Sequence, residues 1–177
     1  RLEPNERGSG FEFTSSIKDD VVPKEYIAAV EQGIAEQINN GVLAGYQLID
    51  LKATLYDCSY HDVDSNEVAF RIAGSMALRD GTLQASPVLL EPIMNAEIEC
   101  PEDYLGKVTS DINRKRGIIT EIKENGAKRK IRAQVPLLET FGYISDLRTL
   151  TSGRGTISLT LLKYSKVTDT VLNQVVV

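Results

Sequence analysis

Residues 118–135 read IITEIKENGAKRKIRAQV, and the fold of this part of the chain can be built outward from them. Residues 131–135 alternate between apolar and polar side chains, which is typical of a strand with one buried face. Residues 118–123 form a second apolar-rich run, and Asn125-Gly126 separates the two runs. Because Asn-Gly accepts the positive φ angles of a tight turn, the stretch predicts a β-hairpin.

On the N-terminal side of this hairpin, the pattern predicts a strand followed by a helix. Residues 94–99 alternate between apolar and polar side chains. Pro101 then opens a helix whose inner face is Leu105, Val108 and Ile112, at spacings of three and four. Gly117 ends this helix.

On the C-terminal side, the pattern predicts a second helix and a last strand. The expected inner face of that helix is Leu138, Phe141, Ile144 and Leu147, and residues 156–161 alternate as a strand. The order β-α-β-β-α-β predicts a ferredoxin-like domain, in which two helices cover one face of an antiparallel sheet.

The first half of the chain predicts a second α+β domain. It contains a short strand at 11–14, a helix opened by Pro23, a strand at 49–55 and a further helix. Ile27, Val30, Ile34 and Ile38 mark the inner face of the first helix, and Val68, Ile72 and Met76 mark that of the second. Asp64 and Glu67 have the spacing of a helix cap and its reciprocal partner. No strand is expected before Phe11, so the domain is interpreted as incomplete at its N-terminus.

The charge of the chain changes after residue 87, where the pattern of strands and helices also indicates a new domain. The 177 residues carry a net charge of −5. Residues 1–87 hold 7 Lys and Arg against 14 Asp and Glu, a net −7, whereas residues 88–177 hold 13 against 11, a net +2. We therefore expect one domain at 1–87 and a second at 88–177, the latter with a C-terminal tail. The absence of a long apolar run and of a leader segment predicts a cytoplasmic protein that does not enter a membrane. The acidic net charge argues against a generic nucleic-acid binder, and DNA is not an expected partner.

The sequence argues against a metal site, a cysteine nucleophile and a calcium loop, and it leaves an anion site open. A single histidine, His61, excludes a multi-histidine metal site, and Cys58, His61 and Asp62 are too close in sequence for an ordinary cysteine nucleophile. Residues 62–73 begin like a calcium loop but lack its glycine and its final glutamate. We expect no catalytic residue, metal or cofactor in this chain. Gly153-Arg154-Gly155 is either a tight connection or an anion site formed by backbone N–H groups.

Basic residues gather at two places in the second half. Arg114, Lys115 and Arg116 end the first helix of the ferredoxin-like pattern, and Lys128, Arg129 and Lys130 follow the hairpin turn. Cations at a helix end and on a hairpin are usually solvated surface. The alternative is contact with a phosphate backbone.

Motifs along nearly the whole chain resemble the fourth and fifth domains of bacterial-type translation elongation factor G. They occur in the family's order without large gaps: 23–30 (PKEYIAAV), 43–46 (LAGY), 59–65 (SYHDVDS), 87–94 (PVLLEPIM), 113–117 (NRKRG), 135–137 (VPL), 141–143 (FGY) and 147–155 (LRTLTSGRG).

The resemblance implies a two-domain α+β fold and a role in translation. The first domain would have a ribosomal-protein-like βαβ fold, truncated at its N-terminus, and the second would be ferredoxin-like. The chain would be the ribosome-binding part of a GTPase that promotes tRNA–mRNA translocation. The GTPase domain, with GTP and Mg²⁺, would belong to the full-length parent, so this chain itself would not be an enzyme.

The resemblance also implies the contact residues. Ser59, Tyr60, His61 and Asp62 would form the tip that enters the decoding region beside the A-site tRNA and mRNA. The second domain would contact large-subunit rRNA through basic residues, for which the candidates are Arg114, Lys115, Arg116, Lys128, Arg129, Lys130 and Arg154.

Two alternatives remain open. The same domains occur in ribosome-recycling and ribosome-protection paralogues, and the tip residues do not separate recycling from translocation. An acylphosphatase-like hydrolase also uses a ferredoxin-like fold. It needs an arginine in the loop after the first strand, where this chain has Pro101-Glu102-Asp103 instead.

Overall fold

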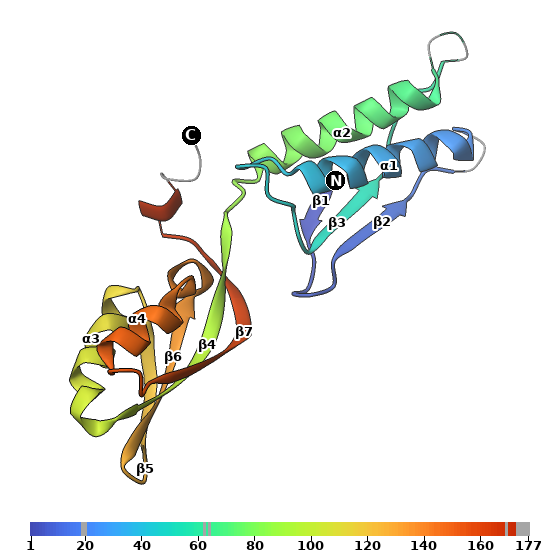
Figure 1. The fold of residues 1–177 in the computed structure, drawn as a ribbon. Coiled ribbons are helices and arrows are strands. Elements are labelled where there is room, and N and C mark those ends of the chain that lie inside the picture. Colours follow the sequence, from blue (N-terminus) through green and yellow to red (C-terminus); the bar gives the residue numbers. More distant parts are fainter. Residues whose placement is uncertain (19–20, 62, 64, 169, 173–177) are drawn as a thin grey trace. The chain divides into compact units, whose positions relative to one another are not determined.

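The structure is a computed structural model that describes residues 1–18, 21–61, 63, 65–168 and 170–172. The chain forms two compact units, one built on Arg1–Val88 and the other on Leu89–Thr168. Both units combine a β-sheet with two helices, as the sequence predicts. Figure 1 shows the elements of each unit.

Unit 1 is a three-stranded sheet with two long helices. The strand order is β1-β3-β2, in which β1 is antiparallel and β2 parallel to β3. Side chains from both helices and from β3 share one core, which includes Val30, Ile34, Ala53 and Leu78. The elements are β1 (Leu2–Pro4), β2 (Phe11–Ser15), α1 (Lys24–Asn40), β3 (Leu51–Leu55) and α2 (Glu67–Gln84).

The prediction that no strand precedes Phe11 is wrong. Leu2–Pro4 forms β1, which pairs with Leu51–Ala53 at the edge of the sheet. Three residues are too short to show an alternation, and Pro4 is tolerated because it lies on an edge strand.

The predicted cap and inner face of α2 are also wrong. The N-cap is Asn66, whose Oδ1 accepts a hydrogen bond of 2.9 Å from the Ala69 N–H, while Asp64 lies outside the described residues. The buried face is Phe70, Gly74, Leu78 and Thr82. The expected core residues Val68, Ile72 and Met76 are 55%, 52% and 59% exposed. Both stripes repeat every four residues, and close packing on α1 selects the one that contains Gly74.

Unit 2 has the predicted ferredoxin-like arrangement. Its four strands pair antiparallel in the order β5-β6-β4-β7. Its core joins the two central strands to both helices through Ala96, Ile98, Cys100, Val108, Ile112, Ile131, Ala133, Val135, Tyr143 and Leu147. The elements are β4 (Leu90–Pro101), the 3₁₀ turn η1 (Glu102–Tyr104), α3 (Leu105–Arg114), β5 (Ile118–Asn125), β6 (Lys128–Pro136), η2 (Leu137–Thr140), α4 (Tyr143–Leu150) and β7 (Thr156–Lys166).

The hairpin prediction is confirmed, but the face of the second helix is only partly correct. Gly126 has a φ of 61° in the turn between β5 and β6. Leu147 is buried, but Ile144 of α4 is 46% exposed. Leu138 and Phe141 lie before α4 and are 57% and 70% exposed. The chain makes a 3₁₀ turn after Pro136, so Tyr143 becomes the first buried residue of this helix.

Candidate functional site

The predicted tip is the loop that joins β3 to α2 in unit 1. Ser59 and His61 are exposed on this loop, and Tyr60 is half-buried. Asp62, the fourth residue of the predicted contact set, lies outside the described residues. The loop therefore presents a hydroxyl and an imidazole to solvent.

Local hydrogen bonds fix the position of His61. Its N–H donates to Ser65 Oγ at 3.0 Å, and its carbonyl oxygen accepts from the Ser65 N–H at 3.0 Å. Asn66 then caps α2. These two bonds and the capped helix that follows hold the backbone of His61, and no hydrogen bond to its imidazole comes from the described residues.

Aromatic packing supports the same loop from inside the unit. The ring of Tyr60 lies 5.6 Å from that of Tyr26, and Tyr26 stacks on Phe70 at 4.8 Å with an interplanar angle of 5°. Tyr60 packs against the core that contains Phe70. This stack joins the loop to α1 and α2, so the tip rests on rigid elements.

Cys58 does not have the environment of a nucleophile. Burial raises the pKa of its thiol, and the nearby Asp57 carboxylate raises it further. The reactive thiolate is therefore disfavoured at neutral pH. The raised pKa thus disfavours Cys58 as a nucleophile.

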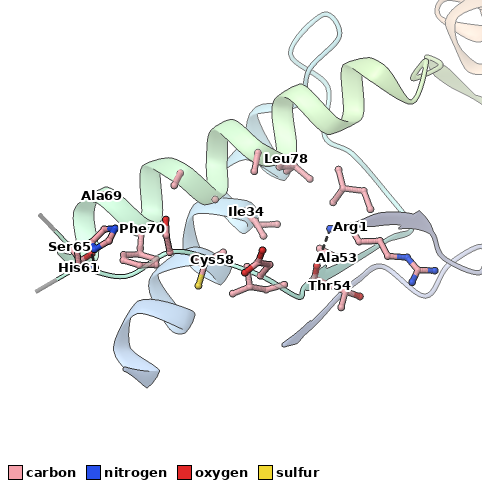
Figure 2. A pocket seen from close by; sticks show the side chains of 18 residues that line it. Arg1, Ile34, Ala53, Thr54, Cys58, His61, Ser65, Ala69, Phe70 and Leu78 are labelled. Atoms are coloured by element: carbon pink, nitrogen blue, oxygen red, sulfur yellow. Dashed lines mark hydrogen bonds between the residues drawn. The ribbon is translucent and has the colours of Figure 1, made fainter. Parts of the chain in front are cut away.

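A groove of about 480 Å³ lies beside the tip loop in unit 1. Figure 2 shows its apolar walls, with Phe70 and Leu78 from α2 and Ile34 from α1, and His61 and Ser65 at one end. At the other end the Arg1 α-ammonium donates to the Thr54 carbonyl oxygen at 3.0 Å. The lining also includes polar side chains, among them Thr54, Asp57 and Ser59.

The basic residues at the end of α3 are engaged by carboxylates. Arg114 pairs with Asp111, which is itself buried, and Lys115 Nζ lies 3.0 Å from Asp146 Oδ2. Arg116 pairs with Glu91 and lies 3.8 Å from Glu139. Each of these cations is thus partly neutralised within the unit.

Most basic residues of the hairpin are also paired. Arg129 Nη2 lies 2.7 Å from Glu102 Oε1 and 3.2 Å from Glu124 Oε1. Lys130 Nζ lies 2.9 Å from Glu97 Oε2. Lys128 is exposed, and within the described parts of the chain no carboxylate lies at ion-pair distance from it.

Arg154 differs from the other candidates because its hydrogen-bond partner is a neutral phenol. Its Nη2 donates to Tyr104 Oη at 2.7 Å, and its guanidinium carbon lies 5.0 Å from the centre of the Tyr104 ring. Lys107 Nζ lies 5.7 Å from the same ring centre. Sequence reasoning missed Tyr104 and Lys107, since 50 and 47 residues separate them from Arg154 and no local pattern joins them.

The hypothesis of a backbone anion site at Gly153-Arg154-Gly155 is wrong. The Gly153 N–H donates to the Arg148 carbonyl at 2.7 Å, and the Arg154 N–H to the Thr151 carbonyl at 3.1 Å. The Gly155 N–H donates to Thr151 Oγ1 at 2.7 Å. With all three N–H groups occupied, any anion here must be bound by side chains.

The described residues contain neither a cluster of metal ligands nor a candidate membrane span. No group of three or more His, Cys, Asp or Glu side chains among them is arranged to hold a metal ion. None of the helices they form has the length and apolar content of a membrane span.

Each half of the chain matches a known protein-family model. Residues 1–86 match the family model described as elongation factor G, domain IV, and residues 88–175 match elongation factor G C-terminus. A crystal structure of a protein from Thermus thermophilus is similar, with 38% sequence identity and a TM-score of 0.82. The match covers 98% of this chain and 26% of that protein.

Proposed function

The chain belongs to the elongation factor G family of translation factors, and from this premise we propose that it is the ribosome-binding part of a GTPase that promotes tRNA–mRNA translocation. Unit 1 would enter the decoding region of the small subunit beside the A-site tRNA and mRNA. Unit 2 would contact rRNA of the large subunit. The partners are therefore RNA surfaces of the ribosome.

The observation that supports this proposal best is the preorganised tip. His61 is exposed on a loop that its own hydrogen bonds to Ser65 close, and an aromatic stack anchors that loop to both helices. An anchored His61 backbone lowers the ordering cost of contact with RNA. An imidazole offers hydrogen-bond donors and acceptors as well as a ring that stacks on unpaired bases.

Nucleotide hydrolysis is assigned to another part of the full-length protein. This chain contains no Gly-x-x-x-x-Gly-Lys-Ser/Thr stretch, so its residues do not fit a phosphate-binding loop of that type. In the proposal, GTP and Mg²⁺ bind a domain outside these 177 residues. In the same proposal, His61 acts through contact with RNA and not through proton transfer.

His61→Ala in the full-length factor tests the proposal. We expect slower translocation with largely unchanged ribosome-stimulated GTP hydrolysis, because the contact is lost while the nucleotide site is untouched. Gln47→Ala is the matched control, since Gln47 is an exposed residue of unit 1 whose side chain bonds to Asn39 at 3.1 Å. Rapid-mixing measurements of mRNA movement and of phosphate release give the two rates.

The alternatives predict different results in the same system. If His61→Ala lowered the rates of translocation and of GTP hydrolysis equally, the assignment of His61 to the tip contact would be contradicted. If His61→Ala slowed separation of the ribosomal subunits but left translocation intact, the recycling role would replace the proposed one.

A further inference from the structure

Three residues of unit 2 form a cluster that the motifs do not reveal. Tyr104 lies directly before α3, Lys107 lies in the first turn of α3, and Arg154 lies in the loop between α4 and β7. Arg154 donates to the phenol oxygen at 2.7 Å, and that oxygen is also 3.2 Å from Ser152 Oγ. Tyr104 therefore joins two loops that are far apart in the sequence.

The Tyr104 ring also attracts the two cations. The Arg154 guanidinium carbon lies 5.0 Å and Lys107 Nζ 5.7 Å from its centre. Both distances are within the range of a cation–π contact. The hydrogen bonds from Ser152 and Arg154, with the positive charges of Arg154 and Lys107, lower the pKa of the phenol.

The two cations keep most of their hydrogen-bonding capacity. Both are exposed, and in the described ranges no carboxylate lies at ion-pair distance from either. The neighbouring carboxylate of Glu102 is paired with Arg129, and Asp103 forms no ion pair with Lys107 or Arg154. A guanidinium has five donors and an ammonium has three, so the single bond to Tyr104 leaves the others available.

We propose that Lys107 and Arg154 bind the phosphate backbone of RNA and that Tyr104 is the positioning residue that holds both of them. The inference rests on the proposed function, in which unit 2 contacts rRNA of the large subunit. A planar guanidinium donates two parallel bonds to a phosphate, and a neighbouring ammonium adds a point charge. Tyr104 holds Arg154 by a hydrogen bond and lies within cation–π distance of both cations in the free protein, so less side-chain entropy is lost when RNA binds.

The cluster is a better phosphate site than the basic residues of unit 2 that are paired with carboxylates. Lys115, Arg129 and Lys130 would have to exchange carboxylate partners for phosphate. Arg154 and Lys107 require no such exchange. The backbone N–H groups around Arg154 are already bonded, so the binding energy must come from these two side chains.

Binding of the chain to purified large ribosomal subunits tests the proposal. The dissociation constant is measured by pelleting at several salt concentrations for the natural chain and for Lys107→Ala, Arg154→Ala and Tyr104→Phe. We expect Lys107→Ala and Arg154→Ala each to weaken binding about tenfold. Each should also reduce the slope of log Kd against log salt concentration by about one. Lys163→Ala, which removes an exposed cation from β7, should leave binding nearly unchanged.

Tyr104→Phe separates a positioning role from a structural one. It keeps the ring but removes the oxygen that bonds to Arg154, so we expect weaker binding and an unchanged unfolding midpoint. Adding Tyr104→Phe to Arg154→Ala should then cause no further loss, because both changes act through one guanidinium. Full additivity of the two substitutions would overturn the positioning role.

Other results would overturn the site itself. These are an effect of Lys163→Ala as large as that of Arg154→Ala, or the absence of any binding of the natural chain to the subunits. The outcome is separate from that of His61, which is measured by translocation. A normal translocation rate in His61→Ala would refute the tip contact and leave the phosphate site standing.

Discussion

Gly33 lies in the middle of α1, where it allows the two helices of unit 1 to approach each other. A Cβ atom at this position would lie 1.9 Å from the Arg71 carbonyl oxygen in α2. Gly74 on α2 has the reciprocal role, since its Cβ would lie 2.7 Å from the Val30 carbonyl oxygen. The backbones therefore pack directly on each other, and neither contact has a flexible side chain that can yield.

Gly33→Ala is expected to destabilise unit 1. The helices must separate to admit the methyl group, and overpacking of this kind costs about 1–3 kcal/mol. Gly106→Ala is the matched control, because no atom outside its own neighbours lies within 4 Å of the added Cβ and alanine favours a helix. Urea unfolding followed by circular dichroism compares the two. Equal stability of the two variants would contradict the close helix contact.

Thr151 is another residue whose role depends on its surroundings. It is fully buried, donates to the Leu147 carbonyl at 2.6 Å and accepts from the Gly155 N–H at 2.7 Å. The hydroxyl thus satisfies two backbone groups where α4 ends and the chain turns toward β7. This turn carries Arg154 to the Tyr104 ring.

At the scale of elements, the outer face of the unit 2 sheet is a ladder of ion pairs. Glu97 on β4 lies 2.9 Å from both Lys130 Nζ and Arg132 Nε of β6, and Arg132 continues to Glu121 of β5 at 3.3 Å. These pairs lie across neighbouring strands, where opposite charges favour the observed register. The same pairing keeps this face from being a simple positive surface.

The ladder predicts a loss of stability in acid. The hydrogen bonds from Lys130 and Arg132 lower the pKa of Glu97 below its ordinary value. A carboxylate with a lowered pKa in the folded state contributes stability above its unfolded pKa, which is about 4.3. This contribution is lost as the pH falls through the lower folded value. The urea midpoint of the natural chain should therefore decrease between about pH 5 and pH 3.

Glu97→Gln should flatten this pH dependence, because the amide does not titrate. Glu99→Gln is the control on the same strand, where the carboxylate accepts a bond of 3.3 Å from the neutral amide of Asn125. If both variants followed the natural chain between pH 5 and pH 3, the ladder would have no part in acid unfolding.

At the scale of the whole molecule, charge and cores are distributed between two units. The net charge of −5 combines an acidic first half with a slightly basic second half. Each unit has its own core cluster. An acidic unit that meets RNA must rely on shape and a few contacts, which is consistent with the proposed tip.

Each unit contains one cysteine, so the reactivity of each thiol depends on the folding of its own unit. Cys58 is half-buried in unit 1 and Cys100 is fully buried in unit 2, and burial raises the pKa of both thiols. We expect one thiol to react slowly with an aromatic disulfide reagent in native buffer, and the second only when unit 2 unfolds. Cys58→Ser should abolish the native reaction. Rapid reaction of both thiols without denaturant would contradict the buried position of Cys100.

The order of elements in unit 2 was predictable from local patterns. Alternation in three predicted strands, Asn125-Gly126 in the hairpin and helical spacing after Pro101 are signals that neighbouring residues carry. The loop at residues 57–63 was predictable on the same basis, whereas its role as a tip was implied only by the family resemblance. Local patterns fail for Leu2–Pro4, where three edge residues are too few to show a period.

Which faces are buried and which charges are free depends instead on how the elements pack. On α2 two stripes share one period, and the approach of Gly33 and Gly74 decides between them. Lys130 and Arg154 look alike in sequence, yet one meets Glu97 across a strand pair and the other meets the phenol of Tyr104. Local patterns cannot separate such cases, because burial and charge pairing involve residues that are remote in sequence and become neighbours only when the strands and helices pack.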